Sequence, residues 1–379
     1  MDKSDNKRIL FYFGGFAPVG GIETFANNLL SHLQTKCFSC QLLCWGQISP
    51  LIKNLKHEKV KIIISPWRWG CQWNIPDWLL LPIGLQQVQQ ADVVLFGKLF
   101  PLKILKKLRV KAHKNTNFIY ITPYKPSLPI NHLEKDKTLE SLNLFDTIIV
   151  QSVTFIKELR KIGYQKRVEV IPYIPHKFGL LKPLPQEEEL KIGFLGRLVE
   201  DKNIPLLLHA FDIFYNKYSN QATLEDREIK KVSLHIFGDG HLRQELEQLT
   251  QDLGIQPYII FHGSIPNSQV EEAIVSCHLF AFTSRSEGQC LAALEILACG
   301  RPIVATEAGA LPEILSDSRL GRLAQSPHPE NFASNILEVV NLLTQKTMTP
   351  EIIRAAYLER YDSDKIGDRY IEIVKSLIS

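Results

Sequence analysis

The chain has 379 residues, of which 45% are hydrophobic and 22% are charged, and its formal net charge is +4. This length exceeds that of one ordinary domain, so we expect two domains, each with a sizeable core. No apolar run reaches the roughly 18 to 20 residues of a membrane span, and the first ten residues lack the apolar core of a signal peptide. Seven cysteines without a paired framework indicate a reducing compartment, and we therefore expect a cytoplasmic protein.

Charge is unevenly distributed along the chain. Residues 1–175 carry a formal charge of +12, whereas the remaining residues carry −8. A difference of this kind is informative about binding partners rather than about fold. We expect an anionic partner for the first part of the chain, but no nucleic acid.

The first half of the chain alternates short apolar runs with amphipathic stretches. An amphipathic helix is expected over residues 22–33. The expected strands are residues 7–13, 40–45, 61–64, 91–96, 117–121, 147–150 and 168–171. Alternating strands and helices predict a parallel, doubly wound sheet. Residues 172–190 lose this periodicity and gain proline and charge, so we interpret them as a linker.

The strand and helix pattern restarts after the linker. The expected strands are residues 190–195, 233–237, 259–262, 279–282 and 302–305, and the expected helices include residues 204–218 and 363–378. We find no internal repeat and no low-complexity tract. The second half therefore predicts another α/β domain of the same class.

Two glycine-containing turns could suggest a dinucleotide site. In the first, FGGFAPVGGIE, the loop contains Gly15, Gly20 and Gly21, which let the backbone approach a ligand closely. Its glycines do not have the spacing of the dinucleotide fingerprint. Residues 238–240, Gly-Asp-Gly, fail as well, because Arg243 stands where a third glycine is required. An NAD-dependent enzyme is therefore disfavoured, and the first loop remains either a ligand loop or a plain tight turn.

Residues 284–312, SRSEGQCLAALEILACGRPIVATEAGALP, form the most informative stretch. A strand leads into a polar loop, a helix begins near Gln289, and Gly300 ends that helix. The N-terminus of a helix presents free N–H groups and about half a positive charge, which suits a phosphate group. Glu287 and Glu295 flank this site and suit hydroxyl groups, which donate hydrogen bonds to carboxylates. A phosphate combined with hydroxyl groups indicates a nucleotide sugar.

The spacing of Glu287 and Glu295 resembles the signature of retaining GT-B glycosyltransferases of family 4 (glycosyl transferases group 1). A second motif, GRLVEDK at residues 196–202, extends the resemblance, which spans most of the chain. The resemblance implies an α/β GT-B fold: two Rossmann-like, doubly wound parallel-sheet domains facing a cleft. It also implies an N-terminal acceptor domain of residues 1–175, a donor domain of residues 176–362, and a final helix, residues 363–379, that crosses back onto the first domain. The spacing alone would also fit a surface helix with two glutamates.

The resemblance implies a role for each residue of the two motifs. Arg197 and Lys202 would bind the donor diphosphate and stabilise its growing charge as it leaves. Glu287 would meet the transferred sugar, and these three residues are the candidate catalytic groups. Glu295 would accept hydrogen bonds from both ribose hydroxyls. The remaining candidate donor-binding residues lie in the two loops: Gly15, Gly20 and Gly21 in the first, and Gly288, Gln289, Cys290 and Leu291 in the second, where backbone N–H groups should face the diphosphate.

This sequence departs from the family pattern at several positions. Gln289 and Cys290 replace the usual aromatic residue and glycine. Many relatives carry a histidine after a strand of the first domain, but here residues 118–121 run into Thr122-Pro123-Tyr124, and the nearby His113 and His132 do not align. A retaining front-face displacement depends mainly on leaving-group stabilisation and positioning, so activity is still expected. No Asp-x-Asp stands on a loop of the second domain, so neither a cofactor nor a catalytic divalent metal is expected.

We therefore expect a retaining glycosyltransferase that moves a sugar from a UDP- or GDP-sugar to a glycan or lipid-linked acceptor, in cell-envelope or extracellular polysaccharide synthesis. The alternative is a catalytically degenerate family member that acts as a binding or regulatory partner, as the missing histidine would allow.

A basic stretch and a tryptophan-rich stretch of the first half lie close together in the sequence. Lys103, Lys106, Lys107 and Lys114 are expected to share one helix face, with Arg109 and Lys111 nearby. Residues 66–85 contain four of the five tryptophans, Trp67, Trp69, Trp73 and Trp78. Tryptophan favours the membrane interface and lysine favours anionic lipid. The pattern fits docking of the first domain on an anionic membrane surface, or else buried tryptophans beside an ordinary solvated helix.

Overall fold

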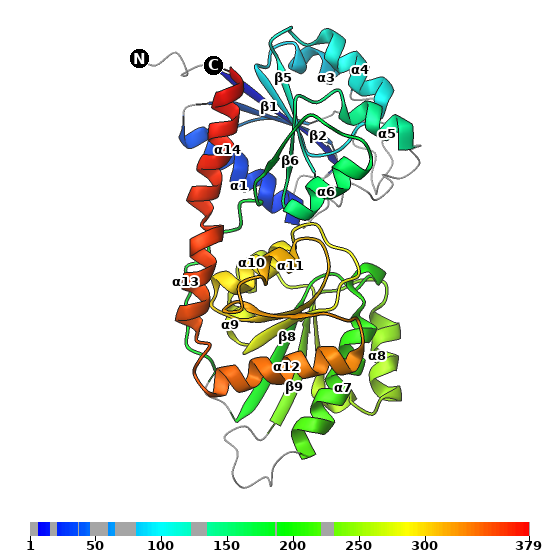
Figure 1. Ribbon diagram of the computed structural model, residues 1–379, viewed down its shortest axis with the longest axis vertical. Coiled ribbons are helices and arrows are strands. Elements are labelled where there is room, and N and C mark those ends of the chain that lie inside the picture. The colour runs from blue at the N-terminus through cyan, green and yellow to red at the C-terminus, as the bar shows by residue number, and fades with distance from the viewer. Residues whose placement is uncertain are drawn as a thin grey trace. The chain divides into compact units, whose positions relative to one another are not determined.

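A computed structural model describes residues 7–15, 21–36, 38–45, 60–64, 81–122, 135–185, 188–220 and 231–378 of the chain. The chain forms two compact units (Figure 1): Met1–His176 together with Ser363–Ser379, and Lys177–Asp362. The division between His176 and Lys177 lies one residue from the boundary that we expected.

The first unit is built on a seven-stranded sheet in the order β3-β2-β1-β4-β5-β6-β7. Its strands are β1 (Arg8–Gly15), β2 (Ser39–Trp45), β3 (Lys61–Ile64), β4 (Val93–Phe96), β5 (Asn117–Ile121), β6 (Thr147–Val150) and β7 (Arg167–Val170). All pairings between these strands are parallel. Every residue of β4 and β6 is buried, as expected for central strands that are covered on both faces.

Aromatic side chains form much of the core of the first unit. The ring of Tyr12 lies 4.7 Å from that of Phe100, and the ring of Phe96 lies 5.1 Å from that of Phe118. The helices are α1 (Gly21–Thr35), α3 (Leu81–Val88), α4 (Leu102–Lys111), α5 (Lys135–Leu142), α6 (Val153–Lys161) and α14 (Ser363–Ile378). Cys40 and Cys44 of β2 are buried and unbonded, and burial raises the pKa of both thiols to about 12. Cys37, two residues before β2, lies outside the described residues.

The C-terminal helix α14 packs on the first unit, beside α1 (Figure 1). The Asn117 side chain donates to the Leu377 carbonyl oxygen at 2.7 Å, and the Tyr370 hydroxyl donates to the Ile171 carbonyl oxygen at 3.3 Å. The ring of Tyr370 also lies 5.6 Å from that of Phe25 on α1. The buried residues recur at helical spacing: Ser363, Ile366, Gly367, Tyr370, Ile371 and Val374. One apolar stripe thus joins the end of the chain to its beginning.

The second unit contains a six-stranded parallel sheet in the order β10-β9-β8-β11-β12-β13. Its strands are β8 (Glu189–Leu195), β9 (Lys231–Phe237), β10 (Ile259–Gly263), β11 (Leu279–Phe282), β12 (Ile303–Thr306) and β13 (Gly321–Ala324). From β8 the successive strands β9 and β10 extend the sheet in one direction, and from β11 the strands β12 and β13 extend it in the other. The loops that follow these two neighbouring strands meet at a topological switch point, where α/β sheets bind ligands.

Helices of the second unit cover both faces of this sheet. They are α7 (Ile204–Asn220), α8 (Arg243–Asp252), α9 (Asn267–Val275), α10 (Leu291–Ala298), α11 (Leu311–Ile314), α12 (Pro329–Thr344) and α13 (Pro350–Tyr361). Helix α12 packs against α7, and α13 packs against α10 (Figure 1). The sequence analysis did not name α12 or α13, although both are bounded by a proline in the first turn.

A buried arginine ties the linker to the second unit. The guanidinium of Arg301 donates to the carbonyl oxygens of Lys182 and Pro183 in the linker, and to those of Val275 and Cys277, all at 2.9 Å. Burial lowers the pKa of Arg301 to about 10. These hydrogen bonds fix residues 182–183 onto the fold without any regular secondary structure.

Candidate active site

The loop after β11 connects that strand to α10, and we call residues 283–290 the site loop. The hydroxyl of Thr283 donates to the Lys202 carbonyl oxygen at 3.0 Å, and the hydroxyl of Thr306 donates to the Ser284 carbonyl oxygen at 2.6 Å. The Arg285 N–H donates to the Asp201 carbonyl oxygen at 2.8 Å. The site loop is therefore fixed both to residues 196–203 after β8, which we call the basic loop, and to β12.

Helix α10 begins at Leu291, two residues after the predicted start near Gln289. The preceding residue, Cys290, has a left-handed backbone with φ of 59°, and its side chain does not cap the helix. A left-handed residue cannot continue a right-handed helix, which explains the later start. The first N–H groups of an α-helix lack the usual partner four residues earlier. In α10 the Ala293 N–H donates to the Cys290 carbonyl oxygen at 3.0 Å, and the N–H groups of Leu291 and Ala292 lie directly after the site loop.

Lys202 and Glu287 form an ion pair at the switch point. Lys202 Nζ lies 2.5 Å from Glu287 Oε1, and the Ser284 hydroxyl donates to the same oxygen at 2.7 Å. The two side chains of the pair are only 19% and 8% exposed. Burial alone would lower the pKa of Lys202, but the net shift is upward, and the attraction and hydrogen bond of the Glu287 carboxylate contribute to it. Lys202 is thus held charged, and two of its three N–H donors remain for another anion.

Arg197 lies near the start of the basic loop and is exposed. The positive charge of Arg197 lowers the pKa of Lys202, whereas Glu287 raises it. The structure gives its guanidinium no hydrogen bond or ion pair within the described residues. Two cations, Arg197 and Lys202, therefore lie near the Glu287 carboxylate.

Glu295 lies one turn into α10 and is half-buried. Among the described residues, no donor or cation pairs with its carboxylate. Burial raises the pKa of Glu295 to about 7. Burial raises the pKa of the Tyr357 hydroxyl on α13, and the charge of Glu295 raises it further. An unpaired carboxylate in such a place is suited to accept hydrogen bonds from a ligand.

Residues 307–310 brace the site loop from behind, and the sequence analysis did not identify them. The Ala310 N–H donates to the Gly288 carbonyl oxygen at 3.0 Å. A Cβ atom at Gly309 would lie 2.3 Å from the carbonyl oxygens of both Glu287 and Gly288, and the φ of Gly309 is +56°. Only glycine fits there. The only sequence pattern that could have indicated residues 307–310 is a glycine shortly after a buried strand. No sequence pattern indicated that Ser284 donates a hydrogen bond to the Glu287 carboxylate.

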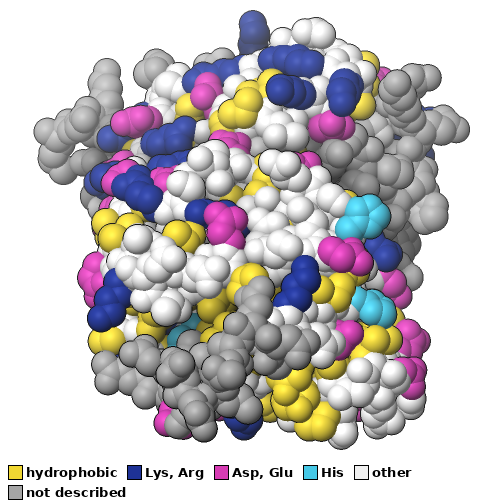
Figure 2. All heavy atoms as spheres, turned by 60° about the horizontal axis from the view of Figure 1, so that its bottom comes forward, with side chains coloured by type: hydrophobic (Ala, Val, Ile, Leu, Met, Phe, Trp, Pro, Cys, Tyr) yellow, Lys and Arg dark blue, Asp and Glu magenta, His cyan; other side chains and the backbone are white. Residues whose placement is uncertain are grey.

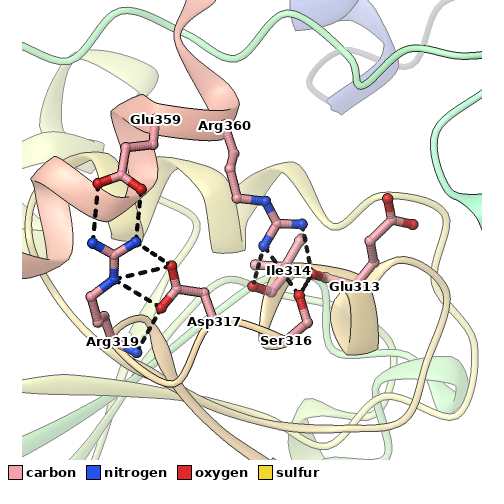
Figure 3. Close-up of polar contacts among 7 residues, drawn as sticks. All are labelled: Glu313, Ile314, Ser316, Asp317, Arg319, Glu359 and Arg360. Atoms are coloured by element: carbon pink, nitrogen blue, oxygen red, sulfur yellow. Dashed lines mark hydrogen bonds and ion pairs between the residues drawn. The ribbon is translucent and has the colours of Figure 1, made fainter.

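Figure 3 shows how the segment after the bracing residues is fixed to α13. Arg360 donates to the Glu313 carbonyl oxygen at 2.9 Å, at the end of α11. Arg319 lies between two carboxylates, at 2.7 Å from both Asp317 and Glu359. The hydrogen bonds from Arg319 lower the pKa of Asp317. Helix α13 thereby holds the short helix that follows residues 307–310.

The Gly238-Asp239-Gly240 turn packs on the basic loop. A Cβ atom at Gly238 would lie 1.8 Å from the Gly196 carbonyl oxygen, and one at Gly240 would lie 2.2 Å from the Leu198 carbonyl oxygen. The Leu198 N–H also donates to the Asp239 carbonyl oxygen at 3.0 Å. These glycines allow two loops to meet, and this explains the motif without a dinucleotide.

Candidate residues of the first unit are only partly described. Gly15 ends β1 and Gly21 begins α1, whereas Gly20 lies outside the described residues. Thr122, at the end of β5, is buried and accepts a hydrogen bond from the Tyr173 hydroxyl at 2.7 Å through its carbonyl oxygen. Of the two nearby histidines, His113 is exposed after α4, and His132 is not described. In the part of the chain that the structure describes, no three His, Cys, Asp or Glu side chains lie close enough together to hold a metal ion.

Two Rossmann-like parallel-sheet units define the fold as GT-B, and known structures agree. The structure of Alr3699/HepE from Anabaena, solved in complex with UDP, matches with a TM-score of 0.76 and 18% identity, covering 97% of this chain and 100% of that one. Residues 181–354 match the family model described as glycosyl transferases group 1. This match confirms, for residues 181–354, the resemblance inferred from the two motifs.

Two curated relatives each match less than half of the chain. A phosphatidylinositol N-acetylglucosaminyltransferase subunit of Arabidopsis thaliana is 26% identical over 185 residues, which are 49% of this chain and 38% of that protein. Alpha-monoglucosyldiacylglycerol synthase of Streptococcus pneumoniae is 33% identical over 156 residues, which are 41% of this chain and 32% of that protein. The matches also span less than half of either relative.

Proposed function

We propose that the chain is a retaining glycosyltransferase that takes its sugar from a UDP- or GDP-sugar. The observation that carries the proposal is the meeting of Lys202 and Glu287 beside the free N-terminus of α10, with unpaired Glu295 one turn further on. This arrangement offers cations and N–H groups to a diphosphate and carboxylates to hydroxyl groups. The UDP bound to the Anabaena neighbour supports a nucleotide donor.

The reaction would depend on charge stabilisation at the leaving group. Arg197 and Lys202 would bind the diphosphate, whose negative charge grows as the bond to the sugar breaks. Glu287 would face the sugar, and Glu295 would bind the ribose hydroxyls. The departing diphosphate could take the proton of the acceptor hydroxyl on the same face, which would retain the configuration of the sugar. No catalytic metal is required, so we expect EDTA to leave turnover unchanged.

The rival function is that of a binding partner without catalysis. Both functions predict nucleotide binding, so a thermal-shift panel with UDP, GDP and other nucleoside diphosphates identifies the base but does not separate them. Slow hydrolysis of nucleotide sugars by the purified chain separates them, because a binding partner would not release the diphosphate. Absence of hydrolysis with every UDP- and GDP-sugar, despite nucleotide binding, would favour the binding partner.

We further propose a lipid-linked or otherwise anionic glycan acceptor, met at the cytoplasmic face of a membrane during envelope or extracellular polysaccharide synthesis. The names of the two curated relatives include a phosphatidylinositol and a diacylglycerol, which supports a lipid acceptor. None of the described helices combines the length and the hydropathy that crossing a bilayer requires. Figure 2 displays one face of the molecule, on which several Lys and Arg side chains gather along the upper edge.

Helix α4 is the described part of the docking surface that we propose. Its buried side supplies Ile104, Leu105 and Leu108 to the core. Its outer side exposes Lys103, Lys106, Lys107 and Lys111 around Val110, which is 87% exposed. Lys106 also pairs with Glu140 of α5 at 2.5 Å. The prediction that Lys114 shares this helical face is wrong, because α4 ends at Lys111, and Trp67, Trp69, Trp73 and Trp78 lie outside the described residues.

Co-sedimentation with anionic vesicles tests this docking surface. Each lysine near anionic lipid contributes roughly 1 kcal/mol, so reversing Lys103, Lys106 and Lys107 to Glu should abolish binding at low salt. A matched control reverses Lys157, Arg160 and Lys161 on α6, which changes the net charge equally. Binding that is lost equally in both variants would reflect net charge alone and contradict a docking surface on α4.

A further inference from the structure

Two histidines on neighbouring strands of the second unit face each other, and neither belongs to the candidate active site. His235 lies on β9 and His262 on β10, which is the edge strand of the sheet. His235 Nδ1 lies 2.9 Å from His262 Nε2, and the two ring planes are inclined by 19°. A hydrogen bond at this distance has one donor and one acceptor, so one of the two nitrogen atoms presents a lone pair to the other ring.

The strands and a neighbouring aromatic ring fix both histidines in place. Ile260 pairs with His235 in the register of the sheet, so His262, two residues further along β10, lies on the same face as His235. The ring of Phe237 stacks on that of His262, with centroids 4.3 Å apart and planes inclined by 10°. His235 is half-buried and His262 is exposed, so the pair is anchored in the sheet on one side and open to solvent on the other.

Ser233 supports the lone pair of His235. The hydroxyl oxygen of Ser233 lies 3.0 Å from His235 Nε2, and Ser233 is buried. In the tautomer whose Nε2–H donates to this oxygen, Nδ1 of the same ring carries the lone pair and directs it at His262. Histidines that bind metal ions donate their other N–H to a neighbour in this way, which fixes the tautomer and orients the ring. His235 therefore has both features of a metal ligand, a directed lone pair and a supporting acceptor.

The distance between the two nitrogen atoms favours one kind of ion. Bonds from a metal to an imidazole nitrogen are roughly 2.0 to 2.1 Å long. Two adjacent ligands of a square-planar ion are then about 2.9 Å apart, whereas two ligands of a tetrahedral ion are about 3.3 to 3.4 Å apart. The observed separation of 2.9 Å matches the square-planar value. Cu²⁺ and Ni²⁺ prefer this geometry, and imidazole is a good ligand for both.

Charged groups of β8 and β9 lie on the same face of the sheet. Glu189 pairs with Lys231 at 3.4 Å, so these two charges largely offset each other. Lys191 pairs with Ser233 in the register and adds a positive charge. Within the described ranges, no third His, Cys, Asp or Glu joins the two histidines. A site of this kind has two protein ligands and takes water at its remaining positions, so it binds its ion reversibly.

We propose that His235 Nδ1 and His262 Nε2 together bind a divalent transition-metal ion that prefers square-planar geometry, Cu²⁺ or Ni²⁺, while Ser233 accepts from His235 Nε2–H. The ion takes the place of the proton between the two rings. That proton leaves His262 Nε2 and a proton from solvent binds His262 Nδ1, so the chain loses no net proton, and the exposed ring tilts to direct its lone pair at the ion. The bound ion joins the edge strand β10 to β9.

This inference goes beyond the proposed function. The two histidines lie on β9 and β10, whereas Lys202 follows β8 and Glu287 follows β11. The ion therefore takes no part in the proposed sugar transfer, and the expectation that EDTA leaves turnover unchanged still holds.

Titration of the purified, EDTA-treated full chain with Cu²⁺ near neutral pH tests the site. Electron paramagnetic resonance should show a square-planar Cu²⁺ with two nitrogen ligands, at less than one equivalent of copper. His235→Gln and His262→Gln should each remove this signal and weaken binding by about tenfold or more. Ser233→Ala should keep the signal but weaken binding by about tenfold. His328→Ala is the matched control, because it removes another exposed histidine of the second unit and should change neither.

A two-nitrogen signal that persists in either glutamine variant, or that the wild type lacks, would overturn the proposal. The melting temperature gives an independent measurement: Cu²⁺ should raise the Tm of the wild type but not that of His262→Gln, which is expected to fold because His262 is exposed. An equal rise in both proteins would also contradict the site. Neither measurement uses a nucleotide sugar, so the result is independent of whether the proposed function holds.

Discussion

Glu295→Gln should make the ligand-free protein more stable at alkaline pH. Burial raises the pKa of Glu295 from 4.5 to about 7, so the folded state holds a proton that the unfolded state releases between these values. The stability linked to this proton is fully present below pH 4.5 and is lost as the pH rises through 7. A shift of this size corresponds to roughly 3 kcal/mol above pH 7, as an upper value. Glutamine stays neutral and avoids this loss.

Urea unfolding at pH 5 and pH 8 measures the effect. Near pH 5 the two proteins should differ little, and at pH 8 the variant should be more stable by about 1 to 3 kcal/mol. Glu287→Gln is the matched control, because it removes the partner of half-buried Lys202 and should destabilise the protein at pH 8. A Glu295→Gln protein whose stability follows the same pH dependence as the wild type would refute the reasoning.

The same substitution should weaken nucleotide binding, because a neutral amide is a poorer acceptor for two ribose hydroxyls than a carboxylate. Calorimetry near pH 7, in buffers of different ionisation enthalpy, should detect proton release when UDP or GDP binds to the wild type and none with Glu295→Gln. Glu287→Gln should act more on turnover than on nucleotide affinity. Equal losses of affinity in both variants would contradict the separate roles of the two carboxylates.

Three further predictions concern the cations and the packing around the site. Arg197→Ala and Lys202→Ala should each slow turnover by about a hundredfold, while circular dichroism should show an intact fold. Near-normal turnover in both variants would contradict the assignment of the diphosphate to these two residues. Arg301→Met leaves buried carbonyl oxygens unsatisfied and should destabilise the protein by roughly 3 kcal/mol or more in urea, whereas Arg319→Met, at an exposed ion pair, should change its stability far less. Gly309→Ala should lower both Tm and turnover, and a variant with wild-type values would show that the bracing contact is unimportant.

Much of the fold followed from local patterns in the sequence. The strands β5, β6 and β11 coincide with the expected ranges, because central parallel strands are short runs of apolar, β-branched and aromatic residues. Helix α14 was also predicted from its apolar stripe. Helix α13 was not, since its burial is spread over more than one side and its periodicity is weak. Yet α13 brings Tyr357 close to Glu295.

The candidate site was predicted as a set of residues but not as a geometry. The motifs identified Lys202 and Glu287, but their ion pair depends on β8 lying beside β11, which no local pattern encodes. The late start of α10 depends on the left-handed backbone of Cys290, which overrides the preference of a residue with a side chain. The fit of Gly309 against the site loop is likewise a contact between segments distant in sequence.

The central claim is that Lys202 and Glu287, at the N-terminus of α10, act on a nucleotide sugar. The most direct test is the release of nucleoside diphosphate from a panel of UDP- and GDP-sugars by the purified wild type and by Lys202→Ala. We predict slow release by the wild type from at least one donor, reduced about a hundredfold in the variant. Release at equal rates by both proteins, or no release from any donor by the wild type, would contradict it.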